Sequence, residues 1–95
     1  MSEARLEHDG AGRLSVSGPM DFDTVPALYA ALPADLRGRA FDVDLSAVTR
    51  ADTAGMGFLL ELLRLGGERG VRFVNIPDQL RAIIRVNGLE ESIGA

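Results

Sequence analysis

Residues 44–57 read Asp44-Leu45-Ser46-Ala47-Val48-Thr49-Arg50-Ala51-Asp52-Thr53-Ala54-Gly55-Met56-Gly57 and form the junction between a strand and a long apolar helix. Ahead of the junction, apolar and acidic residues alternate over residues 41–45, as they do in a strand with one buried face. Behind it, apolar side chains recur at helical spacing over about residues 53–68, and glycines follow. Asp52 and Thr53 therefore stand where a strand gives way to a helix.

The rest of the chain alternates short strands with helices. The other expected elements are strands at residues 5–8, 13–17 and 71–75, a helix capped by Asp23 or Thr24 and ended near Pro33, and a helix opened by Pro77. Helical connections favour parallel pairing of the strands that they join, whereas the first two strands form a hairpin. We therefore expect an α/β fold, a small sandwich whose mixed, mostly parallel sheet has about four to five strands and three to four helices.

Length and charge narrow the class of protein further. The chain has 95 residues, 46% of them hydrophobic, so we expect a single domain over residues 1–95 with one core. A formal net charge of −4 argues against binding to nucleic acid or to an anionic membrane surface. Residues 1–12 lack an apolar leader, and no apolar run reaches the ~18–20 residues of a membrane span. These features predict a cytoplasmic protein that does not insert into a membrane.

Nucleophilic and metal-dependent catalysis both lack their usual residues. His8 is the one histidine, and nothing in the sequence brings it to Ser46 or Thr53 as a general base. The chain has no cysteine, which excludes disulfides, thiolate catalysis and cysteine-based zinc sites. We expect neither a metal nor a cofactor.

Two weaker catalytic patterns occur at the junction itself. Asp44 and Asp52 could in principle form an acid–base pair, but Asp44 points to the outward face of its strand. Residues 55–57, Gly-Met-Gly, lack the Lys-Ser/Thr that a phosphate-binding loop requires. The sequence therefore predicts a protein that is not an enzyme.

The helix after Asp52 is apolar over more than one face. Projection at 100° per residue puts Met56, Leu59, Leu60 and Leu63 on one stripe and Phe58, Leu62 and Leu65 on the opposite flank. The second flank has two interpretations. The helix could be buried between a sheet and a neighbouring helix, or Phe58 and Leu62 could form the centre of a partner-binding surface.

Asp52 and Thr53 lie at the start of this helix, where side-chain oxygens can accept hydrogen bonds from the first free amides. One of the two residues is expected to cap the helix. The helix end carries a partial positive charge, so a phosphate on Thr53 would be tolerated there. Such a phosphate would add up to about two negative charges beside Asp52 and could disrupt a partner interface.

At Asp44-Leu45-Ser46 and at Asp52-Thr53-Ala54-Gly55 the chain resembles the STAS domain family, named for sulfate transporters and anti-sigma factor antagonists. The family pattern is Asp-Leu-Ser, a short loop, and Asp-Ser/Thr-x-Gly at the start of a helix. The family also carries Gly-Glu-Leu/Ile-Asp after its second strand, where this chain has Gly18-Pro19-Met20-Asp21. The resemblance spans nearly the whole chain and implies the small STAS sandwich.

Two branches of the family imply two functions. In anti-sigma factor antagonists, a partner serine kinase phosphorylates the residue after the Asp, which is Thr53 here, while Ala54 replaces the serine that follows. The second branch is the small STAS subunit of the Mla phospholipid-transport ABC complex of Gram-negative bacteria, which the chain resembles at residues 72–83 and 85–90. That resemblance implies an accessory subunit that docks on the transporter's ATPase at the inner membrane and supports outer-membrane lipid asymmetry.

The Mla-type function is the leading hypothesis, and the phosphorylation switch is the alternative. The residues expected to bind a partner are Asp21, Asp52, Thr53, Ala54, Gly55, Phe58 and Leu62, with Thr53 as the expected phosphorylation site. The partner is expected to be an ABC transporter ATPase or, in the alternative, an anti-sigma factor kinase.

Overall fold

A computed structural model describes residues 3–67 and 70–94 and contains a four-stranded sheet with four α-helices among them. In chain order the elements are β1 (Arg5–His8), β2 (Arg13–Met20), α1 (Val25–Ala30), the 3-10 turn η1 (Ala34–Leu36), β3 (Phe41–Ala51), α2 (Thr53–Gly66), β4 (Val71–Val74), α3 (Asp78–Val86) and α4 (Glu90–Ile93). The expected α/β class and the expected numbers of strands and helices are confirmed. The predicted end of the second long helix at Glu68 lies outside the described residues.

The sheet has the strand order β1-β2-β3-β4. β1 and β2 pair antiparallel as a hairpin, whereas β2 with β3 and β3 with β4 pair parallel. The register places Leu14 beside Val43 and Val43 beside Phe73, so apolar residues form rows across three strands. Helical connections between the parallel strands account for this topology, as the sequence predicts.

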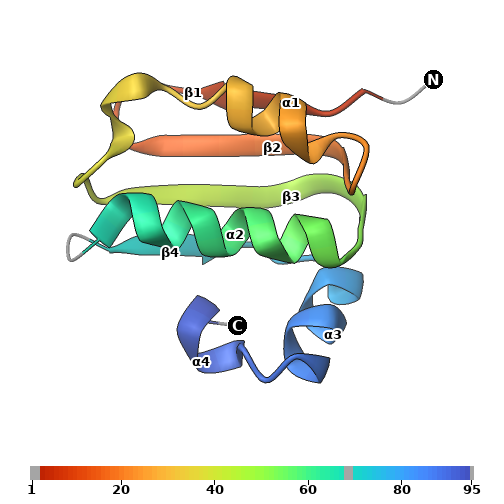
Figure 1. The fold of residues 1–95 in the computed structure, drawn as a ribbon. Helices are drawn as coiled ribbons and strands as arrows, with labels where there is room; N and C mark the ends of the chain where they lie inside the picture. Colours follow the sequence, from red (N-terminus) through yellow and green to blue (C-terminus); the bar gives the residue numbers. More distant parts are fainter. Residues whose placement is uncertain (1–2, 68–69, 95) are drawn as a thin grey trace.

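The helices cover one face of the sheet. Figure 1 shows α1 in front of the β1–β2 side and α2 along the β3–β4 side, with α3 and α4 beyond β4. The core residues of the strands point to this face: Leu14, Val16, Phe41, Val43, Leu45 and Phe73 are all buried. Their partners from the helices include Leu28, Phe58, Leu59, Leu62, Leu80, Ile84 and Ile93. The core is therefore a single apolar layer between the sheet and the helices.

The opposite face of the sheet is polar. Arg13 on β2 forms an ion pair with Asp44 on β3, with 3.2 Å between nitrogen and oxygen. Arg72 on β4 forms an ion pair with Asp42 on β3 at 2.8 Å. Asn75 adds a hydrogen bond of 3.1 Å from its side-chain amide to Asp44. Charged side chains on neighbouring strands thus compensate one another across this face.

β2 and β3 run further than the sequence pattern predicts. β3 alternates buried and outward residues only as far as Leu45, after which Ser46 and Ala47 are both exposed. The β2–β3 register shifts along the same stretch, so the period of two is lost although the pairing continues to Met20 and Ala51. The second half of each strand therefore lacks the alternation from which a strand is predicted in the sequence.

The start of α2 lies close against the end of β2. A Cβ atom on Gly55 would collide with the backbone carbonyl oxygen of Met20. The glycine therefore permits an approach that a larger residue would block, and it brings the loops that follow β2 and β3 together. Of the helices in residues 3–67 and 70–94, none is long and apolar enough to cross a membrane.

Candidate functional site

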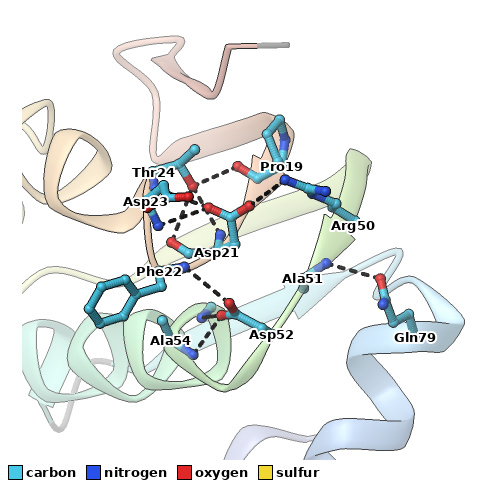
Figure 2. Close-up of polar contacts among 11 residues, drawn as sticks. Pro19, Asp21, Phe22, Asp23, Thr24, Arg50, Ala51, Asp52, Ala54 and Gln79 are labelled. Carbon is cyan, nitrogen blue, oxygen red and sulfur yellow. Dashed lines mark hydrogen bonds and ion pairs between the residues drawn. The ribbon is translucent and has the colours of Figure 1, made fainter. Parts of the chain in front are cut away.

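β2 and β3 are parallel neighbours that end side by side, with Met20 opposite Ala51. The loop from β2 to α1 and the turn from β3 to α2 therefore meet at one end of the sheet (Figure 2). We call residues 19–24 and 50–55 the loop end. It contains Asp21, Asp52, Thr53, Ala54 and Gly55, five of the residues that the sequence singles out.

Asp52 joins the two halves of the loop end. Its Oδ1 atom accepts hydrogen bonds from the backbone amides of Ala54 at 2.8 Å and Gly55 at 3.4 Å, which caps α2. Its Oδ2 atom accepts a hydrogen bond of 3.1 Å from the backbone amide of Phe22, in the other loop. Asp52 is therefore the capping residue of the expected pair, and it also fastens the loop before α1.

Asp21 fixes the shape of that loop from within. Its Oδ1 atom accepts hydrogen bonds from the amides of Asp23 and Thr24 at 3.0 and 3.1 Å. Its Oδ2 atom pairs with the Arg50 guanidinium at 3.0 Å. Thr24 occupies the N-cap position of α1, but its Oγ1 accepts from the Asp21 amide and donates to the Pro19 carbonyl instead of capping the helix. Asp21, not the expected Asp23 or Thr24, supplies the acceptor at this helix start.

These contacts set the charge of Asp21. Partial burial raises its pKa, but the hydrogen bonds from the amides of Thr24 and Asp23 and from the Arg50 guanidinium outweigh that effect. The pKa of Asp21 therefore lies below its ordinary value. The carboxylate stays ionised at neutral pH and serves as a structural acceptor.

A third segment reaches the loop end from α3. The side-chain carbonyl of Gln79 accepts a hydrogen bond of 3.0 Å from the backbone amide of Ala51 (Figure 2). β4 pairs with β3 only as far as Asp44, so at Ala51 a side chain takes the place of a neighbouring strand. Sequence reasoning missed this contact because it joins residues 28 positions apart without any local pattern.

A family model described as "Mlab, STAS domain" matches residues 4–94 of the chain. The chain belongs to the STAS domain family. The resemblance carried by residues 44–46 and 52–55 is thereby confirmed at the level of the family. No curated protein matches this STAS domain in sequence.

Solved structures share the fold. An anti-sigma factor antagonist from Mycobacterium paratuberculosis is 34% identical, with a TM-score of 0.74, 98% of this chain covered and 83% of that chain. A sulfate transporter family protein from Wolinella succinogenes is 22% identical, with a TM-score of 0.65 and coverage of 95% and 76%. The anti-sigma factor antagonist SpoIIAA in its unphosphorylated form is 16% identical, with a TM-score of 0.62 and coverage of 86% and 81%. The last two likenesses concern the fold alone.

Thr53 is exposed on this STAS domain, as the first residue of α2. Ala54 is half-buried, and Gly55 is buried against the end of β2. The Thr53 hydroxyl is thus presented to solvent beside a carboxylate that is already engaged with three backbone amides. Of the residues expected at the start of the helix, Thr53 offers the most accessible side chain.

The prediction that Phe58 and Leu62 face a partner is wrong. Both side chains are fully buried, at 0% exposure, in the core of this chain. The Phe58 ring meets the Tyr29 ring of α1 edge to face, with 5.0 Å between the ring centres. The other interpretation, a helix buried between the sheet and a neighbouring helix, accounts for this flank. Periodicity gives the angle between two apolar stripes but not which of them the fold covers.

A different aromatic residue is exposed at the loop end. Phe22 lies between Asp21 and Asp23 and is 79% exposed. Figure 2 shows its ring projecting away from the hydrogen-bonded side chains. Phe22 lies in a loop and therefore belongs to no periodic pattern, so only its place between two acidic residues marks it in the sequence.

A hollow of about 330 Å³ opens beside Phe22. Its lining residues are Asp21, Phe22, Asp23, Arg50, Ala51 and Asp52. Three carboxylates and one guanidinium give the lining a formal charge of −2, from three negative groups and one positive group. The loop end therefore combines a rigid backbone, an exposed aromatic ring and a negative surface.

Proposed function

We propose that this STAS domain is a non-catalytic binding module that docks, through its loop end, on the ATPase subunit of an Mla-type phospholipid transporter. The match to the family model described as "Mlab, STAS domain" over residues 4–94 carries the choice of partner. Docking would support assembly or activity of the complex and hold the domain at the cytoplasmic side of the inner membrane through its partner.

The geometry of the loop end supports a docking role. Asp21 and Asp52 use their carboxylates to hold backbone amides, so the two loops keep one shape before any partner arrives. A preorganised surface loses less conformational entropy on binding than a mobile one. Thr53 stands exposed on that surface, where a contact with a partner needs no rearrangement of this chain.

The test is retention of the purified ATPase subunit by the immobilised domain. Thr53→Glu replaces a small hydroxyl with a longer side chain that a close contact at Thr53 does not accommodate, and we expect it to weaken retention at least tenfold, while Thr53→Ser keeps the hydroxyl and retains the ATPase. Ser92→Glu is the matched control, because it introduces the same side chain at an exposed residue of α4. Wild-type protein that does not retain the ATPase, or Thr53→Glu that retains it normally, would contradict the proposal.

A second candidate function is a phosphorylation switch on Thr53. It is favoured by the 34% identity to an anti-sigma factor antagonist over 98% of this chain and by the exposure of the Thr53 hydroxyl. A phosphate there would lie at the positive end of α2, which stabilises it, and would add charge to an already negative surface. The added group would also fill space on a surface that a partner contacts closely, and would thereby disrupt the interface.

Intact-mass measurement after incubation with an anti-sigma factor kinase and ATP separates the two functions. A switch predicts a mass increase of one phosphoryl group in wild type and none in Thr53→Ala. An unchanged wild-type mass, with the same kinase active on its own substrate, would count against the switch and leave the transporter function as the proposal.

A further inference from the structure

Phe22 is unusual among the large apolar side chains of the described residues. Three of these are markedly exposed: Phe22 at 79%, Tyr29 at 39% and Val86 at 86%. The Tyr29 ring packs on Phe58, and Val86 lies at the end of α3. Phe22 alone of the three belongs to the loop end, so its exposure coincides with the surface proposed to dock.

The backbone around Phe22 is held while its ring is not. The Phe22 amide donates to Asp52 at 3.1 Å, and the amides on either side donate to Thr24 Oγ1 at 2.9 Å and to Asp21 Oδ1 at 3.0 Å. Three consecutive amides are thus bonded to side chains of the loop end. The loop fixes the backbone from which the exposed ring projects, and folding has already met the entropic cost of ordering that backbone.

The chemistry of the ring and its surroundings defines what it can fit. Exposed aromatic side chains that become buried on association are frequent energetic anchors of interfaces, especially when their backbone is preorganised. The hollow next to the ring has a formal charge of −2 from Asp21, Asp23, Asp52 and Arg50. A complementary surface therefore pairs an apolar socket with basic side chains at the rim of that socket.

We infer that Phe22 is the anchor of the docking surface, and that its ring enters an apolar socket on the partner protein whose rim carries Arg or Lys side chains. This inference rests on the proposed docking function and names the partner surface that the loop end would meet. Phe22 supplies affinity, whereas the carboxylates of Asp21, Asp23 and Asp52 attract the basic rim during association and orient the partner. A second copy of this chain is a poor match for the surface, because two loop ends facing each other would bring like charges together.

The experiment measures dissociation constants by calorimetry for the ATPase subunit and, separately, for an anti-sigma factor kinase. We expect Phe22→Ala to weaken binding at least 30-fold and Phe22→Leu to weaken it by less, since leucine keeps an apolar side chain. Val86→Ala is the matched control, because it truncates an equally exposed apolar residue away from the loop end and should change affinity by less than twofold. Melting temperatures should stay the same, since neither side chain is part of the core.

The charge component is tested with Asp23→Asn. We expect this variant to slow association and to reduce the salt dependence of binding, with dissociation little changed. Phe22→Ala that binds within twofold of wild type overturns the anchor. Light scattering that finds a wild-type dimer and a Phe22→Ala monomer overturns it as well, in favour of self-association.

Failure of the inference and failure of the proposed function give different results. If wild type binds the kinase and not the ATPase, the transporter function is overturned. The affinity of Phe22→Ala for the kinase then tests whether Phe22 is the anchor. If wild type binds the ATPase and Phe22→Ala binds equally well, the proposed function is supported and the role of Phe22 as anchor is overturned. If wild type binds neither protein, both are overturned.

Discussion

The carboxylate of Asp52 accepts hydrogen bonds from backbone amides in both halves of the loop end. Two of these amides lie in the first turn of α2, and the third belongs to Phe22. A side chain at an N-cap normally serves one helix. Here the same residue also fixes the position of the residue that we infer to be the anchor. The Asp52 carboxylate thus helps to set the spacing between Thr53 and Phe22 on the surface.

Gln79 also holds the loop end with its side chain, which reaches it from α3. Ala51 is 7% exposed, so loss of the acceptor for its amide should cost about 1–3 kcal/mol of unfolding free energy. We predict this loss for Gln79→Leu in urea denaturation, together with faster hydrogen exchange of the Ala51 amide measured by NMR.

Two further variants test the assignment of that effect. Gln79→Glu keeps an acceptor oxygen and should restore most of the protection. Arg85→Leu changes an exposed polar residue of the same helix and should stay within about 0.5 kcal/mol of wild type. Unchanged Ala51 exchange in Gln79→Leu would mean that another group satisfies this amide.

At the scale of elements, the close contact between α2 and the end of β2 depends on the absence of a side chain. We predict that Gly55→Ala destabilises the fold by about 1–3 kcal/mol, because its Cβ collides with the Met20 carbonyl and must push the helix start away from the strand. Gly57→Ala, in the same helix with open space around its Cα, should instead stabilise by up to about 1 kcal/mol.

Urea denaturation of both variants checks this prediction, and partner binding extends it. Displacement of α2 would move Thr53 relative to Phe22, so Gly55→Ala should also weaken docking, whereas Gly57→Ala should not alter the helix start. Equal stability of the two alanine variants would contradict the close-contact argument.

The elements also show what sequence alone can supply. Alternation and turn residues were enough to predict four strands, the parallel pairing and a cap at Asp52 or Thr53, because each depends on neighbours in the chain, but they did not give the full length of β2 and β3. The Tyr29–Phe58 contact, the Asp21–Arg50 ion pair and the Gln79 contact each join residues 28 or 29 positions apart. No local period encodes such contacts, and an exposed loop residue such as Phe22 has no period at all.

For the whole molecule, carboxylates with lowered pKa values make stability depend on pH. The pKa of Asp44 lies well below its ordinary range because of hydrogen bonds from the Ser46 amide and the Asn75 side chain, with a contribution from Arg13. The pKa of Asp21 is lowered too. These groups bind protons more readily in the unfolded chain, so the stability that they add above about pH 4 is lost as pH falls toward their lower folded values.

We therefore predict that the free energy of unfolding falls steeply below about pH 4. Asp44→Asn should be less stable than wild type at neutral pH and should show a shallower acid slope. Urea titrations at a series of pH values measure both effects. An acid slope equal to that of wild type would mean that Asp44 does not contribute to acid unfolding.

The polar face of the sheet has a consequence for how these molecules meet one another. A second sheet can stack on the uncovered face of a sheet, and such stacking is favourable when that face is apolar. Here stacking would strip water from the Arg13–Asp44 and Arg72–Asp42 pairs, and dehydrating ion pairs is costly. The uncovered face of the sheet is therefore a costly surface for stacking, in contrast to the loop end, which we propose as the docking surface.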